Sequence, residues 1–464
     1  MTPRAFVIAG PSSGAGKTTV ALGLMAAFRR RGLLVQPFKC GPDFIDPGHH
    51  ERVCGRPSRN LDGWMLSPAA NEAIFRRHAA PADVSVVEGV MGLFDGANGS
   101  GRGSTAEMAT RLRLPIVLVV DASKMAASAA ALVHGFATFD PEVGLAGVIF
   151  NKVGSPSHYA LLTDALARAG DAVPLGYLPR DEQLRMPERY LGLVTADEGV
   201  LSGQAVSHLA DVIEQHVDLD RVLSTAAAVA GSPGRTAAHI SATRVRIGIA
   251  RDRAFSFYYE DNFDALRAEG ADLIPFSPLH DRELPHGLDA LYFGGGYPEL
   301  CVEVLAGNVP MQQSVRRFVE SGRAVYAECG GLMYLAQAIE GADRRSWPMV
   351  GVLPFTVVMT DRLQQFGYVE VAFTQDCLLG AGGTIARGHS FHCSRIAAVP
   401  SGISRSYRLQ YTLAGIEEAE GFSMGSVLAS YIHLHFDSSP GLAHAFVEAA
   451  ARSRSISHEV EAPR

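Results

Sequence analysis

Cysteine is scarce in this chain of 464 residues, and no long apolar run occurs in it. The six cysteines are scattered and never form a CxxC pair, which argues against a disulfide framework and against a zinc cluster. No uncharged segment reaches the roughly 18 residues that a membrane-spanning helix needs. The N-terminus lacks the basic and apolar segments of a secretory signal. We therefore expect a cytoplasmic protein in a reducing compartment, with no membrane partner.

Lysine is almost absent too, because Lys17, Lys39, Lys124 and Lys152 are the only lysines among 41 basic residues. An ammonium is a compact point charge and a guanidinium is a planar fork, so the retained lysines mark positions to examine. The formal net charge is −7, with 47% hydrophobic and 19% charged residues. This balance is typical of a soluble globular protein and does not favour a nucleic-acid partner.

The length exceeds that of one ordinary core, and we expect two domains. Residues 1–216 alternate short apolar strands with amphipathic helices, a pattern typical of an α/β domain with a parallel sheet covered on both faces. Residues 217–243 are small and polar without periodicity, which predicts a linker. Residues 244–450 show a second α/β pattern, and residues 451–464 form a charged tail.

The segment VIAGPSSGAGKTTVALGLMAAF predicts a phosphate-binding loop between a strand and a helix. In such loops backbone N–H groups hold phosphate oxygens, and here Lys17 would reach the terminal phosphates while the Thr18 hydroxyl would ligate Mg²⁺. The strict pattern requires glycine five residues before Gly16, but Pro11 stands there and the nearest glycine is Gly10. The loop is therefore one residue longer than the standard form.

Two further segments place carboxylates after predicted strands. VVEGVMGLFDG puts Glu88 at the tip of a buried strand, where a carboxylate beside a phosphate loop suits Mg²⁺ or a reacting group. KCGPDFIDPGHH brings Lys39, Asp43 and Asp46 into a turn-rich loop. A solvated turn carboxylate and an ordinary loop are the structural alternatives. GVIFNKVG presents Asn151 and Lys152 past a late strand, where an amide pairs with a base edge and an aliphatic stem covers its face.

A strand-to-helix corner is predicted at Cys329, between the apolar segments AVYAE and GLMYLAQAI. Gly330 and Gly331 supply the small neighbours that a sharp turn of this kind requires. At a helix N-terminus the dipole favours a thiolate, and the Gly330 N–H helps to hold an oxyanion. The alternative is a cysteine that is merely buried.

A cysteine nucleophile needs a base, and the candidate is His433 in SVLASYIHLHF. FGGGYPE supplies further oxyanion donors at Gly295 and Gly296, with Tyr297 lining the pocket, unless it is only a tight turn. For the two histidines of RGHSFHCS a packed role is at least as plausible as a catalytic one. These two residues are His389 and His392.

The chain resembles the family of cobyrinic acid a,c-diamide synthases of vitamin B12 biosynthesis, over nearly its whole length apart from linker and tail. The motifs that carry the resemblance occur in the family's order: the phosphate loop, KCGPDFIDPGHH, NLDGWML, VEGVMGLFDG, MPERYLGLV, AECGGLMYL, RGHSFHCS and SYIHLHF. The resemblance implies an ATP-binding domain like that of dethiobiotin synthetase, followed by a class I-like glutamine amidotransferase domain.

In such enzymes ATP phosphorylates the a and c side-chain carboxylates of a corrin macrocycle, and ammonia released from L-glutamine displaces the phosphate. The resemblance implies Cys329 as the nucleophile that attacks the glutamine amide and His433 as its base. It implies Mg²⁺ between the phosphates, held by Thr18, Glu88 and Asp43. Nucleotide-binding positions would be Gly14, Gly16, Lys17, Thr18, Thr19, Asn151 and Lys152, and positions near the corrinoid would be Asp43, Phe44, Ile45, Asp46 and Asp95.

Two positions depart from the expected pattern. Class I amidotransferases usually carry His-x-Glu, in which the glutamate orients the histidine, but position 435 is histidine here. That fits the subgroup that works with a Cys-His pair and leaves the group that orients His433 unidentified. In MPERYLGLV, Tyr190 stands where the family has histidine, and we assign it no role.

Several alternatives remain open at this point. The substrate is cobyrinic acid or the metal-free hydrogenobyrinic acid, and cobyric acid synthase and a nickel-sirohydrochlorin a,c-diamide synthase are related activities. A P-loop partitioning or regulatory ATPase is an alternative of a different class, although it leaves Cys329 and His433 without a task. The order of the two amidations, the ammonia path and the oligomeric state, including a homodimer, are not defined by the sequence.

Overall fold

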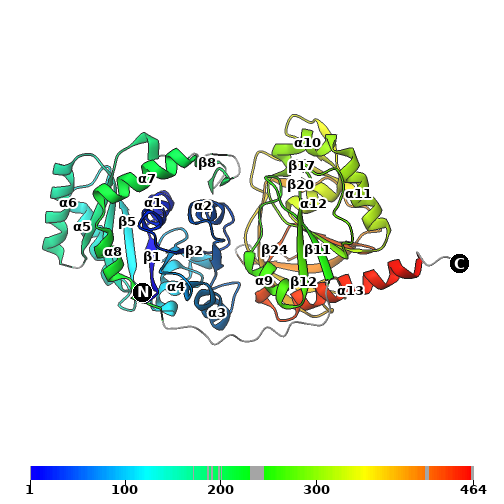
Figure 1. The fold of residues 1–464 in the computed structure, drawn as a ribbon, viewed down its shortest axis with the longest axis horizontal. Helices are drawn as coiled ribbons and strands as arrows, with labels where there is room; N and C mark the ends of the chain where they lie inside the picture. The colour runs from blue at the N-terminus through cyan, green and yellow to red at the C-terminus, as the bar shows by residue number, and fades with distance from the viewer. Residues whose placement is uncertain are drawn as a thin grey trace. The chain divides into compact units, whose positions relative to one another are not determined.

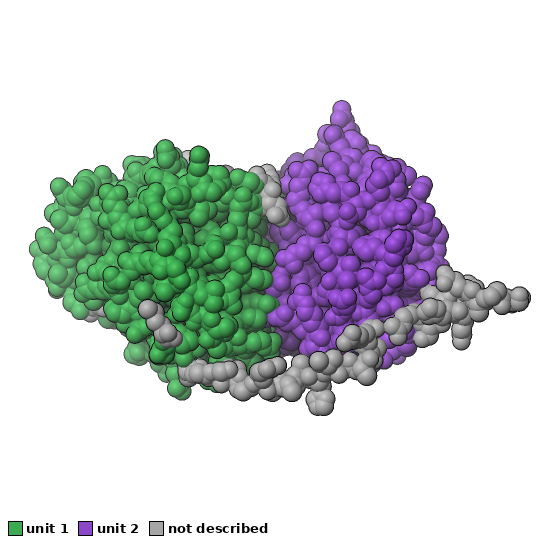
Figure 2. Space-filling view, viewed as in Figure 1, with its two compact units in different colours: residues 1–236 green, residues 237–464 purple. Residues whose placement is uncertain are grey.

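The computed structural model describes residues 2–170, 172–184, 186, 188–189, 192–196, 199, 201–229, 245–412 and 417–460. The chain divides into two compact units, Met1–Thr236 and Ala237–Arg464, which Figure 2 shows in green and purple. Each unit has a sheet and a core of its own.

Unit 1 is built on a parallel sheet whose seven main strands lie in the order β3-β2-β4-β1-β5-β6-β7. In that order the strands are β3 (Arg59–Leu61), β2 (Val35–Cys40), β4 (Val84–Glu88), β1 (Arg4–Ala9), β5 (Ile116–Asp121), β6 (Leu145–Val153) and β7 (Pro174–Pro179). β2 and β4 are buried along their whole length and β1 from its second residue on. The prediction of a parallel α/β domain is confirmed.

The helices of unit 1 follow the strands in alternation (Figure 1). They are α1 (Lys17–Arg30), α2 (Ile45–Cys54), α3 (Pro68–Ala79), α4 (Thr105–Leu112), α5 (Ala127–Thr138), α6 (Pro156–Ala169), α7 (Gly203–His216) and α8 (Leu219–Thr225), with short 3₁₀ turns η1 (Ala97–Gly99) and η2 (Glu182–Leu184). Serine side chains accept a backbone N–H at the start of α3, α4, α6 and α7, as expected for N-caps. A small hairpin joins β8 (Glu188–Arg189) to β9 (Gly192–Leu193).

The segment 217–243, expected as a linker, begins with regular structure. It contains α8, and β10 (Ala227–Ala228) pairs antiparallel with the start of β1. Leu219 and Val222 are buried in the core of unit 1. Unit 1 therefore includes structure beyond the predicted boundary at residue 216.

Unit 2 contains a ten-stranded sheet in the order β12-β11-β13-β14-β23-β22-β21-β18-β19-β24. The strands are β12 (Ala271–Phe276), β11 (Val245–Ala250), β13 (Ala290–Phe293), β14 (Ala324–Glu328), β23 (Val427–Ser430), β22 (Glu417–Met424), β21 (Ser404–Tyr411), β18 (Gln365–Phe373), β19 (Ile385–His392) and β24 (His433–Leu434). The first five pair in parallel and the remaining pairs are antiparallel. A smaller sheet holds β16 (Ser346–Pro348), β15 (Ala336–Glu340), β17 (Leu353–Met359) and β20 (Ser394–Ile396).

Unit 2 has both short and long helices among its described residues. They are α9 (Glu260–Ala268), α10 (Val302–Gly307), α11 (Val309–Glu320), α12 (Gly330–Leu335) and α13 (Leu442–Val460), with 3₁₀ turns η4 (Pro298–Cys301) and η5 (Phe436–Ser438). The tail expected from residue 451 begins inside α13, which continues to Val460. None of the helices within the described ranges is long and apolar enough to cross a membrane.

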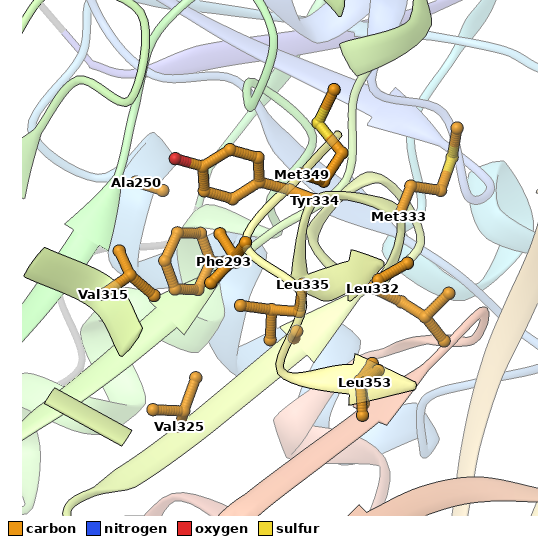
Figure 3. Packing of buried hydrophobic residues seen from close by; sticks show 14 of the residues in the cluster. Ala250, Phe293, Val315, Val325, Leu332, Met333, Tyr334, Leu335, Met349 and Leu353 are labelled. Atoms are coloured by element: carbon orange, nitrogen blue, oxygen red, sulfur yellow. The ribbon is translucent and has the colours of Figure 1, made fainter. Parts of the chain in front are cut away.

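The short helix α12 is anchored in one of the two apolar cores of unit 2. Figure 3 shows Leu332 and Leu335 packed among side chains from neighbouring strands, including Phe293 of β13 and Val325 of β14. All six residues of α12 are buried. The helical pattern that predicted a longer helix is wrong beyond Leu335, because Ala336 starts β15 and pairs with β17. The turn before α12 is thus anchored by packing of the helix in an apolar core.

Candidate functional site

In unit 1 the phosphate-loop residues lie between β1 and α1, as predicted. Gly16 caps α1 with a left-handed φ of 98°, and a Cβ built there would lie 1.9 Å from the Asn151 side-chain nitrogen. The position therefore requires glycine both for its conformation and for space. Thr18 and Thr19 form the first turn of α1, and Gly14 is exposed on the loop with φ 78°.

Lys17 is folded back against this loop. Its Nζ donates hydrogen bonds to the carbonyl oxygens of Ser12 at 3.0 Å and Met91 at 2.5 Å. Burial, together with the nearby Lys39 ammonium, lowers the pKa of Lys17 to about 8. In a phosphate-binding loop, phosphate oxygens would replace these two carbonyl oxygens as acceptors for the Lys17 ammonium.

Glu88 is the centre of the polar cluster in unit 1. The parallel register places it beside Ile8 of β1 and Lys39 of β2, and its side chain is fully buried. Its Oε1 accepts from Thr18 Oγ1 at 2.6 Å and Lys39 Nζ at 3.0 Å, and its Oε2 lies 2.7 Å from His50 Nε2. Burial alone would favour the neutral acid, but Lys39 and the His50 and Thr18 hydrogen bonds hold the pKa of Glu88 below its usual range.

Lys39 joins Glu88 to the loop that follows β2. Its Nζ forms an ion pair with Asp46, lies 3.6 Å from Asp43 Oδ2 and donates to the Gly89 carbonyl at 3.2 Å. Although burial disfavours the ammonium, Asp46 and Glu88 raise the pKa of Lys39 well above its ordinary value. One ammonium therefore faces three carboxylates, and oxygen ligands with surplus negative charge are what a hard divalent cation such as Mg²⁺ takes.

The other residues expected near the substrate lie on adjacent loops. Asp43 Oδ1 accepts the backbone N–H groups of Ile45 at 2.8 Å and Asp46 at 3.2 Å, so it fixes the start of α2, with Phe44 at the N-cap. Asp95 Oδ2 accepts from Gly92 N at 2.9 Å, in a loop joined to the phosphate loop by the bond from Leu93 N to Gly10 O at 2.8 Å. The structure thus brings Asp43, Asp46 and Asp95 to the carboxyl edge of one sheet.

Asn151 and Lys152 lie in the last residues of β6 at the same edge, not past the strand as the sequence predicted. The Asn151 amide donates to the Ala15 carbonyl at 3.1 Å, and its oxygen accepts from Lys152 N at 2.9 Å. The half-exposed Lys152 ammonium pairs with Asp121 Oδ2 at 2.7 Å. Asn151 therefore braces the phosphate loop, a contact that the sequence interpretation did not anticipate.

His50 was missed at the sequence level. It is fully buried, bonds Glu88 through Nε2 and lies 3.0 Å from Ser58 Oγ through Nδ1. The sequence signal was its place in KCGPDFIDPGHH, a polar segment directly after a buried strand.

In unit 2 the predicted corner is present at Cys329. The residue follows β14 and caps α12 with φ 44° and ψ −100°, a strained backbone conformation for a side chain with a Cβ. Its N–H donates to the Ser430 carbonyl at 2.7 Å, and its Sγ lies 3.9 Å from the Phe391 carbonyl. Burial raises the pKa of the Cys329 thiol, so the expected preference for a thiolate is wrong in this state. A buried thiol of this kind needs a base.

The segment 294–298 connects the corner to His433. A Cβ built on Gly295 would lie 2.3 Å from His433 Cε1, and one built on Gly330 would lie 3.0 Å from Gly296 N. The Gly331 N–H donates to the Gly294 carbonyl at 3.0 Å. The glycines therefore let two backbone segments and an imidazole approach each other closely. Tyr297 packs its ring against Phe257 at 5.1 Å.

His433 begins β24 and is buried. Its Nδ1 lies 3.7 Å from Glu328 Oε2, and its ring stacks on His389 with a centroid distance of 5.0 Å. His389 Nδ1 in turn lies 2.8 Å from the Tyr259 hydroxyl. Burial and then His433 lower the pKa of His389, which makes it a neutral neighbour. His392 instead stacks on Tyr431 at 3.9 Å.

His435 occupies the position at which class I amidotransferases usually carry glutamate, and here its contacts are structural. Its Nδ1 accepts from Asp437 N at 3.3 Å, and its ring packs on Tyr259 at 4.7 Å. Burial lowers the pKa of His435 to about 3, so it is a neutral imidazole. Glu328, which directly precedes Cys329 in the sequence, places a carboxylate oxygen 3.7 Å from His433 Nδ1, and the sequence did not point to it. Tyr190 lies outside the described residues.

Comparisons with known proteins match both units of the chain. Residues 6–194 match the CobQ/CobB/MinD/ParA nucleotide binding domain, and residues 246–441 match the CobB/CobQ-like glutamine amidotransferase domain. A nucleotide-binding domain followed by an amidotransferase domain defines a glutamine-dependent amidating ligase. Among solved structures, one of a glutamine amidotransferase is 22% identical and covers 44% of this chain and 98% of its own, with a TM-score of 0.31.

Curated relatives extend the match over nearly the full chain. Cobyrinate a,c-diamide synthase of Syntrophotalea carbinolica is 48% identical over 96% of this chain and 98% of the relative. The proteins of that name from Dehalococcoides mccartyi (strain CBDB1) and Salmonella typhimurium are 43% and 41% identical, over 95% and 97% of this chain and 97% and 98% of each relative. The chain belongs to the cobyrinate a,c-diamide synthase family.

Proposed function

We propose that this ligase amidates the a and c side-chain carboxylates of cobyrinic acid or hydrogenobyrinic acid, using ATP and ammonia from L-glutamine. The observation that carries the proposal is that one chain holds both a cysteine corner with a buried histidine and a phosphate loop beside a carboxylate cluster. Each site supplies one half-reaction. The names of the relatives favour cobyrinic acid as the substrate.

In unit 2, Cys329 attacks the side-chain amide carbon of glutamine. His433 takes the thiol proton and passes it to the departing ammonia, which leaves a glutamyl thioester. Water then hydrolyses this thioester to glutamate. The backbone N–H groups around Gly330 and residues 295–297 support the oxyanion that forms on the amide oxygen.

In unit 1, the phosphate loop with Lys17 and Thr18 holds the ATP phosphates, and Asn151 and Lys152 lie near the adenine. A substrate carboxylate attacks the γ-phosphorus, giving ADP and an acyl phosphate. Ammonia attacks the acyl carbon and releases phosphate, so each amide consumes one ATP and one glutamine. Asp43, Phe44, Ile45, Asp46 and Asp95 are the residues proposed to contact the corrinoid and the transferred phosphate.

The donor set of unit 1 fits Mg²⁺, because a hydroxyl and carboxylates with surplus negative charge surround one ammonium. Thr18, Glu88 and Asp43 would hold the ion. When bound, Mg²⁺ supplies positive charge that offsets the negative charge of the phosphates.

The test is the mass of the corrinoid product. Purified protein with Mg²⁺, ATP and glutamine is incubated with cobyrinic acid and, separately, with hydrogenobyrinic acid. The proposal predicts two successive amidations of at least one macrocycle, each with release of one ADP and one glutamate. If neither macrocycle gains mass although ATP and glutamine are bound, the proposal is wrong.

A further inference from the structure

We propose that Glu328 is the positioning residue of His433, supplying from β14 the carboxylate that position 435 lacks. The proposal rests on the proposed glutaminase function of unit 2. It is carried by geometry: Glu328 Oε2 lies 3.7 Å from His433 Nδ1, and both side chains are almost completely buried. At this distance and depth, the charges of a carboxylate and a protonated imidazole interact strongly.

The same carboxylate holds the backbone beside the histidine. Glu328 Oε1 accepts from Leu434 N at 3.1 Å, directly after His433. Glu328 also ends β14 and pairs in register with Ser430 of β23, three residues before His433. One side chain therefore holds the main chain directly after His433 and lies 3.7 Å from the His433 ring, and it is adjacent in sequence to Cys329.

Two buried tyrosines fix the orientation of the Glu328 carboxylate. Tyr326 OH donates to Oε1 at 2.6 Å, and Tyr292 OH donates to Oε2 at 3.1 Å. Burial, followed by the charge of Glu328, raises the pKa of both phenols well above the ordinary value, so they are neutral donors. With three donors in place, the carboxylate is oriented before any substrate arrives.

Two further titratable groups near His433 lie on β19. His389 stacks on the ring and His392 lies further along the strand, and burial lowers the pKa of each, so both are neutral imidazoles. His435 contacts Asp437 N and the Tyr259 ring, so it does not orient His433. Glu328 places a carboxylate oxygen 3.7 Å from His433 Nδ1, within ion-pair distance of a protonated imidazole.

This placement defines what Glu328 does in the reaction. A carboxylate beside Nδ1 favours the tautomer with its proton on Nδ1, which lets Nε2 accept the thiol proton of Cys329. It also stabilises the imidazolium that forms when the proton has moved. The proton then passes from His433 to the departing ammonia. Because burial raises the pKa of the Cys329 thiol, this charge separation needs such support.

The experiment compares Glu328→Gln with Glu420→Gln in the full-length chain. Glu420 is a matched control, since it is a buried carboxylate of unit 2 that accepts from Gly421 N, Ser430 Oγ and Tyr431 N. Glutamate release is measured across pH for each variant, and ammonium-dependent amidation is measured in parallel. Circular dichroism and thermal unfolding report the folding of each variant.

We expect E328Q to lower kcat for glutamate release by on the order of 100-fold or more, with a smaller change in KM. The acid limb of its pH profile for glutamate release should shift to lower pH, because removing the negative charge of Glu328 disfavours the protonated imidazole of His433. Ammonium-dependent amidation should remain. E420Q should keep the wild-type acid limb, and Glu328→Asp, which retains the charge, should restore the acid limb and part of kcat.

Three results would overturn the proposal: wild-type glutamate release by E328Q, an unshifted acid limb in E328Q, or equal losses in E328Q and E420Q. If E328Q does not fold, kcat for glutamate release by Glu328→Asp decides: a value below that of E420Q supports the proposal, and a value equal to that of E420Q overturns it. Failure of the proposed glutaminase function gives a different result from failure of the proposal for Glu328. In that case Cys329→Ala would release glutamate at the wild-type rate, whatever the result for E328Q.

Discussion

The Thr18 hydroxyl donates to Glu88 Oε1 at 2.6 Å, which ties the first turn of α1 to the end of β4. Lys39 and His50 contact the same carboxylate from β2 and α2. Because β2, β4 and β1 are consecutive in the sheet order, all of these groups meet at one edge. The phosphate loop and the proposed substrate loop, residues 43–46, therefore contact the same charged cluster around Glu88 and Lys39.

Glu88→Gln should abolish amidation while leaving glutamate release in place. The substitution removes a negative charge that faces Thr18 and Lys39, and with it a proposed ligand of Mg²⁺. We expect ATP-dependent amidation to fall by at least about 100-fold, an effect of the size seen when a group acting on developing charge is removed. Glutamate and ADP release are measured separately. Amidation at the wild-type rate in E88Q would contradict a role for this carboxylate.

ATP binding should be accompanied by proton uptake near pH 8. Burial lowers the pKa of Lys17 to about 8, so a substantial fraction of the free protein carries the neutral amine at that pH. Phosphate anions placed beside Nζ favour the ammonium and raise this pKa, which means that a proton is taken up on binding. Calorimetry at pH 8 in buffers of different ionisation enthalpy measures the uptake. Equal heats in all buffers would contradict the prediction, and Lys17→Arg is the control that should show none.

Gly295→Ala should impair glutamate release without impairing ammonium-dependent amidation. A Cβ at this position would lie 2.3 Å from His433 Cε1, so the imidazole or the backbone segment has to move. Misplacement of a catalytic group by about 1 Å costs roughly 100-fold in rate. Gly307→Ala is the matched control, because a Cβ there meets no atom within 4 Å. Equal glutamate release by the two variants would show that close approach at Gly295 is unimportant.

His50→Ala should weaken both the fold of unit 1 and its affinity for ATP. His50 bridges Glu88 and Ser58 in a fully buried position, and removing it leaves buried polar groups without this partner. The expected cost is about 1–3 kcal/mol in the free energy of unfolding. Urea unfolding and the KM for ATP are the two measurements. A stable variant with unchanged KM would mean that His50 does not support the Glu88 cluster.

The sequence predicted the local features of both sites well. The corner at Cys329 was recognisable because a buried apolar strand and two glycines surround it, and the predicted strand 324–328 is β14 as found. The phosphate loop was recognisable despite Pro11 because its strand and helix are strongly patterned. In each case residues close together in the chain determine the structure.

Features that depend on distant pairing were not predictable in the same way. The role of Glu328 follows from the pairing of β14 with β23, about 100 residues further along the chain. The end of α12 at Leu335 follows from the pairing of β15 with β17, which overrides a helical pattern. The raised pKa of the Cys329 thiol reflects burial by the whole unit, whereas the sequence analysis considered only the helix N-terminus.

The central claim is that two separate sites in one chain perform two half-reactions, and one measurement tests it most directly. Cys329→Ala and the control Cys377→Ala, which alters a half-buried cysteine of the same unit, are assayed for corrinoid amidation with glutamine and with ammonium chloride. The account predicts that C329A loses glutamine-dependent amidation and keeps ammonium-dependent amidation, while C377A keeps both. Amidation by C329A with glutamine at the wild-type rate would contradict it.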